Sequence, residues 1–502
     1  MRLPCAPRIA VATLLLGGLA GACAVTFDPP DLGEQYDRVA RYHGPERNPI
    51  VVIPGLTGSN LVDGASGRVV WGAFTGDYAR PARAEDLRLI ALPMNEGTSL
   101  GQLRDEVRPD GVLDRVRVKV LGIPLVVRAY VQILAMLGAA GYRDESLGLA
   151  GAVDYGSDHY TCFQFDYDWR RDNVESAFRL ARFLDEKRAY VRQEGRRRFG
   201  TDPGEARFDV VAHSMGALVV RYFLRFGDAE LPADGSLPPV TWAGAGAVER
   251  VVLVGPPNAG SLAALVELVE GHRPGPMLPR YPPALLGTFP SIYQLLPRRR
   301  HGSLFVEGLG GRAGDLYDPD LWERMGWGLA SPAQEPILAE LLPDVGDAGQ
   351  RQRIALDHLH KSLARARQLA AALDQQAPPP PPHLQLFLVA GDAAPTARTA
   401  VVDPPSGRLR VVSRGSGDGT VLRSSALLDE RVGGVWQAQL RSPVPWRSVL
   451  FLFTDHLGLT RDPAFSDNVL FWLLEQPRSR DPRSPNARRP ASHRFRLHAP
   501  GR

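Results

Sequence analysis

The chain has 502 residues, of which 44% are hydrophobic and 23% are charged. These fractions are close to globular averages, so the chain can bury a core and is not expected to be disordered as a whole. The formal net charge is only +4 and the arginines are scattered or gathered near the end of the chain, which gives no indication of a nucleic-acid partner. Length alone does not decide the number of domains, because a single doubly wound sheet with insertions can span a chain of this length.

Residues 1–24 have the features of a targeting segment, with a positive start followed by an apolar stretch rich in small residues. Residues 22–24 fit a signal-peptide cleavage site, whereas residues 19–23 resemble a bacterial lipobox with one extra residue. An uncleaved anchor is a third interpretation, although the stretch is short for a bilayer span. The segment therefore predicts export, either as a cell-envelope lipoprotein acylated at Cys23 or as a secreted protein.

The positions of the three cysteines indicate whether disulfides stabilise the mature protein. Cys5 and Cys23 fall within the targeting segment, so Cys162 is the thiol expected to remain in the mature body. We predict no intramolecular disulfide and a buried, unreactive Cys162, with a large hydrophobic core stabilising the fold.

From about residue 45 onward, apolar runs alternate with helical patterns, which is typical of a mainly parallel sheet flanked by helices. We expect sheet strands at 50–53, 161–165, 208–212, 251–254, 384–389 and 449–453. We expect helices from about 173, at 215–226, through 262–268, at about 350–376 and at 467–474.

Two irregular stretches interrupt this alternation. One covers residues 72–150, and the other covers 271–345 and leads into the helix that ends near 376. We therefore predict one domain over residues 45–476, with insertions at about 72–150 and 271–376. A disordered basic tail is expected at 477–502.

The residues Ala212-His213-Ser214-Met215-Gly216 lie between a predicted strand and a predicted helix. Small residues on both sides of Ser214 permit the sharp turn of a nucleophile elbow, which predicts an α/β-hydrolase fold with cap insertions. Acyl transfer by a serine needs a base, an orienting acid and oxyanion donors. We nominate as donors the backbone N–H groups of Met215 and of Leu56, which follows the first strand. His213 is expected to be a packed histidine whose hydrogen bonds are made within the protein, with no catalytic role.

In this fold the triad residues occur in the order serine, acid, histidine. His456 follows the last apolar strand and precedes a helix, which favours it as the base. Asp418 follows the strand-like run 409–412 and Asp392 follows the run ending at 389, so both are candidates for the acid. The histidines of the second insertion are interpreted as solvated or lid residues: His272, His301, His358 and His360.

Several segments together resemble the lecithin:cholesterol acyltransferase family. They are NPIVVIPGLTGSNL at the first strand, FDYDWR at 165–170, VVAHSMGALVVRYFL around Ser214, GPPNAGS at 255–261, APT at 394–396, GDGTV at 417–421 and DHLGL around His456. The GDGTV aspartate is the triad acid in that family, so the resemblance implies Asp418 as the acid, and not Asp392. It also implies that Leu56 belongs to the oxyanion loop and that Asp168-Trp169-Arg170 has a structural role.

The resemblance implies a serine enzyme that forms an acyl-enzyme on a lipid or phospholipid ester and needs no metal or organic cofactor. Transfer of the acyl group to water would make it a lipase or phospholipase, and transfer to an alcohol would make it an O-acyltransferase. A carboxylesterase for small soluble esters and a non-catalytic surface lipoprotein are the alternatives. Aromatic residues of the irregular stretches suit a cap that contacts a membrane or lipid surface, although buried packing explains each equally well: Trp71, Phe74, Trp322 and Trp327.

Overall fold

The computed structural model describes most of the chain between residues 30 and 477. Gaps in this description fall at 43, 45–46, 75–76, 113–114, 121–122, 129, 147–158, 201, 203–205, 275–277 and 309–313. The expected targeting segment and the tail from residue 478 lie outside the described residues.

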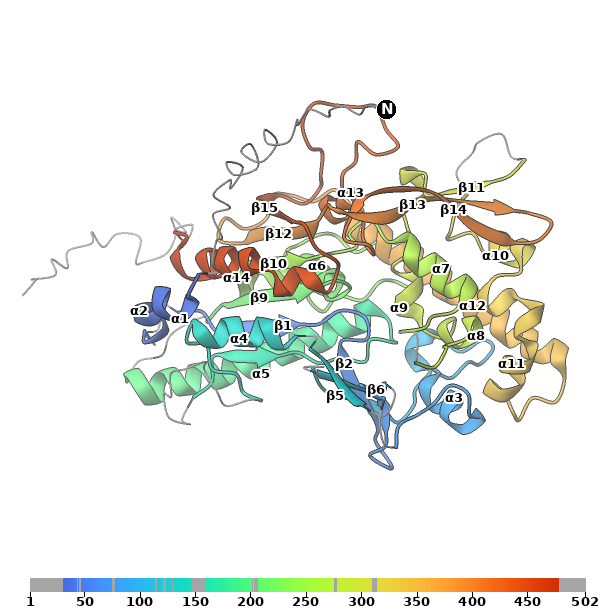
Figure 1. Cartoon of the computed structure of the whole chain (residues 1–502), viewed down its shortest axis with the longest axis horizontal. Coiled ribbons are helices and arrows are strands. Elements are labelled where there is room, and N and C mark those ends of the chain that lie inside the picture. Colours follow the sequence, from blue (N-terminus) through green and yellow to red (C-terminus); the bar gives the residue numbers. More distant parts are fainter. Residues whose placement is uncertain are drawn as a thin grey trace, which may run out of the picture.

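A six-stranded parallel sheet forms the centre of the molecule (Figure 1), with the strand order β15-β12-β10-β9-β1-β8. Its strands are β1 (Ile50–Ile53), β8 (Cys162–Gln164), β9 (Phe208–His213), β10 (Val248–Val254), β12 (Gln385–Gly391) and β15 (Trp446–Leu452). All of the strands predicted for this sheet are confirmed, with small shifts at their ends.

Strands β1, β9, β10 and β12 are buried along their whole length and consist mostly of apolar residues, because helices cover both faces of the sheet. In β1, Val51 and Ile53 belong to one buried cluster, whereas Ile50 and Val52 belong to another. The first cluster is covered by α5 (Asn173–Phe199), α6 (Gly216–Phe226) and α12 (Ala348–Asp374), and the second by α4 (Val131–Ala139) and α14 (Pro463–Leu470). The predicted helices are confirmed, although the last is shared between α14 and a π-helical turn at Phe471–Glu475.

The first irregular stretch contains more regular structure than its sequence pattern indicates. Strand β5 (Val107–Val112) joins β2 (Ser59–Asp63) and β3 (Val69–Trp71), and β4 (Ala73–Phe74), β6 (Arg115–Val120) and β7 (Ile123–Arg128) form another small sheet. Helices α3 (Ala84–Ile90) and α4 complete it. These elements are short, which explains why no clear period is visible.

The second insertion follows α7 (Leu262–Glu270) and is built from short elements. These are α8 (Pro283–Leu286), α9 (Pro290–Tyr293), β11 (Leu304–Val306), α10 (Pro319–Met325) and α11 (Glu335–Leu341). Proline occupies the first turn of all four of these helices, where its missing N–H costs no helical hydrogen bond. In Figure 1, α8, α10 and α11 lie to the right of the central sheet.

A long hairpin separates the last two strands of the central sheet. It consists of β13 (Ala394–Asp403) and β14 (Arg408–Gly417), which pair antiparallel and form a second sheet with β11. The strand-like run 409–412 is therefore confirmed, but it belongs to this second sheet. The hairpin returns to its starting point, where Ala394 bridges to Asp418, so Asp418 lies again at the end of β12.

The remaining helices are α1 (Leu32–Gln35) and α2 (Asp37–Ala40) near the beginning and α13 (Arg423–Leu427) after the hairpin. Across the described part of the chain, no helix combines the length and apolar character that crossing a bilayer requires.

Candidate active site

Ser214 occupies a sharp turn between β9 and α6. Its backbone adopts φ 53°, a left-handed conformation that is rare for residues other than glycine. The turn is held because the Ser214 N–H donates to the Val254 carbonyl oxygen at 2.8 Å. A Cβ added at Gly216 would come within 2.3 Å of the Pro54 carbonyl oxygen. This close approach explains why the residue two positions after Ser214 is a glycine.

Ser214, His456 and Asp418 form one hydrogen-bonded chain. The Ser214 Oγ lies 2.9 Å from Nε2 of His456, and the Nδ1 of His456 lies 2.7 Å from Oδ2 of Asp418. The other carboxylate oxygen of Asp418 accepts the backbone N–H groups of Thr420 at 3.0 Å and Val421 at 2.6 Å. The Asp418 side chain therefore has a fixed orientation, with one oxygen directed at the imidazole.

The environment of Asp418 favours its charged form. Burial alone would raise the pKa of this carboxyl, but the His456 imidazole and the two backbone donors outweigh it and lower the pKa below the ordinary value. An ionised Asp418 keeps the proton of His456 on Nδ1 and leaves Nε2 free to accept the proton of Ser214.

Asp392, the other candidate acid, makes no contact with His456 in the described structure. Its Oδ1 is buried without a hydrogen-bond partner, and its Oδ2 lies 4.0 Å from Nε of Arg423. A Cβ added at the adjacent Gly391 would come within 2.6 Å of the Asp418 Cβ. Both aspartates thus lie near the end of β12, but Asp418 makes the contact with the imidazole.

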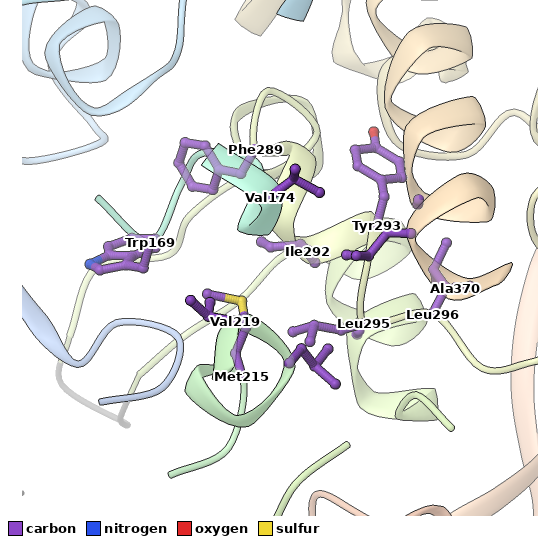
Figure 2. Close-up of a cluster of buried hydrophobic side chains, with 14 of the residues drawn as sticks. Trp169, Val174, Met215, Val219, Phe289, Ile292, Tyr293, Leu295, Leu296 and Ala370 are labelled. Atoms are coloured by element: carbon purple, nitrogen blue, oxygen red, sulfur yellow. The ribbon is translucent and has the colours of Figure 1, made fainter. Parts of the chain in front are cut away.

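The backbone N–H groups of Leu56 and Met215 donate no hydrogen bond within the described part of the chain. The loop that carries Leu56 is nevertheless held firmly, since the Tyr167 hydroxyl donates to the Pro54 carbonyl oxygen at 2.9 Å and the Trp71 indole donates to the Thr57 carbonyl oxygen at 2.9 Å. The Met215 side chain belongs to the buried cluster of Figure 2, where it lies among Val219, Ile292 and Leu295. An oxyanion site requires backbone N–H groups that are free to donate, so Leu56 and Met215 stay the candidate donors.

A cavity of about 420 Å³ opens at Ser214 and is mainly apolar. Trp71 and Trp169 line it from the core side, and the second insertion contributes His272, Leu278, Tyr281, Leu286, Phe289, Ile292 and Leu295. Trp322 and Trp327 lie elsewhere, buried to 0% and 2% exposure, and the Phe74 side chain lies outside the described residues. The part of the insertion before residue 296 therefore forms the wall over Ser214.

The histidines of the insertion have different surroundings. His358 is buried on α12, where its Nε2 lies 3.1 Å from the Thr288 carbonyl oxygen and burial lowers its pKa to about 4. Burial and the nearby Arg300 lower the pKa of His301 to about 4 as well. The solvated interpretation is therefore wrong for both imidazoles, whereas the alternative interpretation as lid residues stays a prediction. His360 is exposed beside Glu323, and His272 pairs with Glu267 in the cavity wall.

Cys162 and Arg170 are buried residues outside the triad. Cys162 is buried in β8, and burial holds the pKa of its thiol well above the ordinary value, so it remains a protonated thiol. Arg170 is fully buried and forms ion pairs of 2.7 Å with both Asp168 and Asp105, while the Trp169 indole donates to the Ser59 carbonyl oxygen at 3.2 Å. The Arg170–Asp105 ion pair ties the segment after β8 to the first insertion.

Comparisons with known proteins agree with this architecture. A model of the lecithin:cholesterol acyltransferase family matches residues 151–311. The resemblance to this family is thereby confirmed. The matched segment contains Ser214 and the turn around it. Asp418 and His456 lie beyond the end of the match. No curated protein matches the chain.

One solved structure shares the fold over most of the chain. The crystal structure of a Tle4-Tli4 complex has 16% sequence identity and a TM-score of 0.52, and the match covers 86% of this chain and 98% of the other. The Bacillus licheniformis lipase BlEst2 in propeptide form has 12% identity and a TM-score of 0.28, with 88% of this chain and 53% of the other covered. The first likeness, together with the parallel sheet and its elbow, confirms the α/β-hydrolase fold.

Some residues of the site were not predicted from the sequence. Tyr130 lies in the first irregular stretch, yet its hydroxyl accepts the Gly55 N–H at 2.9 Å next to the serine. Thr396, part of the APT segment, accepts the N–H of Gly419 at 2.8 Å and so holds the loop that follows Asp418. The APT segment was the available signal for Thr396, whereas nothing local marks Tyr130.

Proposed function

We propose that this protein is a serine hydrolase or O-acyltransferase that acts on the acyl group of a lipid ester. One observation carries the proposal: Ser214 Oγ, the His456 ring and the Asp418 carboxylate are connected by hydrogen bonds of 2.9 and 2.7 Å at the mouth of an apolar cavity. The match to the lecithin:cholesterol acyltransferase family supports a lipid ester as the substrate class.

In the proposed reaction, His456 Nε2 takes the proton of Ser214 while Oγ forms a bond to the ester carbonyl carbon. The negative oxygen that results accepts hydrogen bonds from the N–H groups of Leu56 and Met215. When the C–O bond to the alcohol breaks, His456 returns the proton to the departing oxygen, leaving an acyl-enzyme on Ser214. Water or another alcohol then repeats these steps and releases the acyl group as an acid or as a new ester.

The wall of the cavity supports a long acyl chain as the group bound there. Phe289, Ile292 and Leu295 are buried on the second insertion and face the space next to Ser214. Each methylene transferred from water to such a surface contributes about 0.8 kcal/mol. We expect kcat/KM to rise with acyl length until the cavity is filled.

Esters of increasing acyl length, assayed below and above the concentration at which they aggregate, test the substrate class. Turnover that is highest on the shortest chains and indifferent to aggregation would contradict a lipid substrate and favour a carboxylesterase for soluble esters. Adding glycerol or a sterol decides the fate of the acyl group: new esters formed on the added alcohol indicate acyl transfer, whereas free acid alone indicates hydrolysis.

Contact with a membrane or lipid surface is proposed for the edge of the site that carries His456. Phe453 is 82% exposed and Leu457, which lines the cavity, is 49% exposed. Apolar side chains in such positions are stabilised when they enter a lipid surface. Phe453→Ser should lower turnover on vesicles and leave turnover on a soluble ester unchanged. Val412→Ser, an exposed site on β14, is the control, and equal effects of the two variants on vesicles would contradict the proposed surface.

Export to the bacterial cell envelope is proposed from residues 1–24, whose sequence fits a cleaved leader. If Cys23 is acylated, Cys23→Ser should release the protein from membranes, and the mature N-terminus should carry a lipid by mass spectrometry. A soluble chain beginning after residue 24 would indicate simple secretion, and a mature chain that still begins at Met1 would contradict both routes.

A further inference from the structure

Two buried side chains outside the triad connect the loop of Leu56 to the loop of His456. The N–H of Gly55 donates to the Tyr130 hydroxyl oxygen at 2.9 Å, and this oxygen lies 3.1 Å from Nδ1 of His213. The Nε2 of His213 lies 3.2 Å from the backbone carbonyl oxygen of His456. Tyr130 and His213 are 4% and 3% exposed, so water does not compete for these bonds.

These hydrogen bonds admit one arrangement of protons. Burial and the neighbouring His456 lower the pKa of His213 to about 3, so its ring is neutral and has one donor and one acceptor. The carbonyl of His456 can only accept, which places the His213 proton on Nε2. Nδ1 is then the acceptor for the Tyr130 hydroxyl, whose oxygen accepts the N–H of Gly55.

We propose that Tyr130 and His213 form a positioning relay, which sets the oxyanion loop and the base loop at a fixed distance from each other across Ser214. The inference rests on the proposed function, because it assigns the relay a task in the reaction of Ser214. Both side chains line the cavity beside Ser214, but the hydrogen bonds that they make go to the backbone of Gly55 and His456 and to each other, not to the side chains of Ser214 or His456. Each therefore acts through the backbone that it holds.

The position of the two loops predicts that loss of the relay lowers kcat more than it raises KM. Gly55 immediately precedes Leu56, and a Cβ added at Gly55 would come within 2.7 Å of the Ser214 Cβ, so a small shift of this loop changes the position of the Leu56 N–H relative to Ser214. At the opposite end, the rings of His213 and His456 are in contact, with centroids 4.8 Å apart. Tyr167 and Trp71 also donate to the oxyanion loop, and the Gly58 N–H donates to the Gly55 carbonyl oxygen within it, but none of these bonds involves His456.

The test replaces the relay groups one at a time and compares kcat with KM. Tyr130→Phe removes the hydroxyl and keeps the ring, and we expect kcat to fall about 10- to 100-fold with KM nearly unchanged, because loss of a whole oxyanion donor costs about 100- to 1000-fold. His213→Leu should have a similar effect. His213→Gln keeps an amide donor for the His456 carbonyl and an acceptor for Tyr130, and should recover most of the activity.

Tyr222→Phe is the matched control, because Tyr222 is also buried and its hydroxyl donates to the Ala229 carbonyl oxygen at 2.7 Å away from the relay. It should lower Tm without lowering kcat. Because Tyr130 and His213 belong to one chain, the fold-loss of the double variant Tyr130→Phe/His213→Leu should be smaller than the product of the single losses.

Labelling with a fluorophosphonate separates the two ways in which these ideas can fail. If the unmodified protein is not labelled at Ser214, the proposed function is wrong. If Ser214 is labelled but Tyr130→Phe turns over like the unmodified protein, or the double variant shows the full product of the single losses, the relay is wrong. A drop in kcat for Tyr130→Phe, recovery in His213→Gln and an unaffected Tyr222→Phe would support it.

Discussion

Replacement of Asp418 by asparagine should abolish catalysis because it moves the proton of His456 from Nδ1 to Nε2. The carboxylate accepts backbone N–H groups of Thr420 and Val421 on Oδ1, so in Asp418→Asn the amide oxygen must take that position. The amide nitrogen then replaces Oδ2, which lies 2.7 Å from His456 Nδ1. Two N–H donors would face each other unless His456 moves its proton to Nε2, where it can no longer accept the proton of Ser214.

The expected loss in kcat is about 10,000-fold, or about 5 kcal/mol of barrier, the size found when a serine triad holds the wrong histidine tautomer. The assay is kcat on a chromogenic ester, with thermal unfolding to establish that the variant is folded. Asp392→Asn is the control and should leave turnover near that of the unmodified protein, since Asp392 does not contact His456 in the described structure. A folded Asp418→Asn that retains most turnover, or a larger loss in Asp392→Asn, would refute the assignment of the acid.

Two other predictions concern stability. Gly216→Ala places a Cβ 2.3 Å from the Pro54 carbonyl oxygen and should lower the free energy of unfolding by about 1–3 kcal/mol. Gly346→Ala is the control and should leave Tm unchanged, because a Cβ there has nothing within 4 Å. Equal Tm values for the two variants would contradict the packing argument. Burial lowers the pKa of His358 to about 4. Between about pH 6.5 and pH 4, the unfolded chain therefore binds a proton at this residue that the folded protein does not. The free energy of unfolding should fall by up to about 3 kcal/mol as the pH drops through this window. His358→Gln should weaken this pH dependence of the unfolding free energy, and an unchanged slope would count against a neutral buried His358.

Local patterns in the sequence predicted much of the fold. Continuous apolar runs such as 50–53 and 251–254 indicate strands buried on both faces, and the helix after Ser214 follows from its apolar periodicity. The elbow was visible because its steric demands select small residues beside the serine. The chain order of α/β-hydrolases then led to His456, which the structure brings into hydrogen-bond contact with Ser214.

Long-range contacts explain what the sequence did not reveal. The choice between Asp418 and Asp392 depends on the return path of the β13–β14 hairpin, and no local pattern contains that path; the family resemblance was needed to select Asp418. His358 was misinterpreted because its partner, the Thr288 carbonyl, is 70 residues away along the chain. Tyr130 was missed for the same reason, since its hydrogen-bond partners are distant in sequence.

The most direct test of the proposed mechanism is labelling of the intact protein with a fluorophosphonate, followed by mass spectrometry of the labelled peptide. The proposal predicts one phosphonyl group on Ser214, loss of esterase turnover in step with labelling, and neither labelling nor turnover in a folded Ser214→Ala variant. Label on another residue, or turnover in Ser214→Ala equal to that of the unmodified protein, would contradict the assignment of Ser214 as the nucleophile.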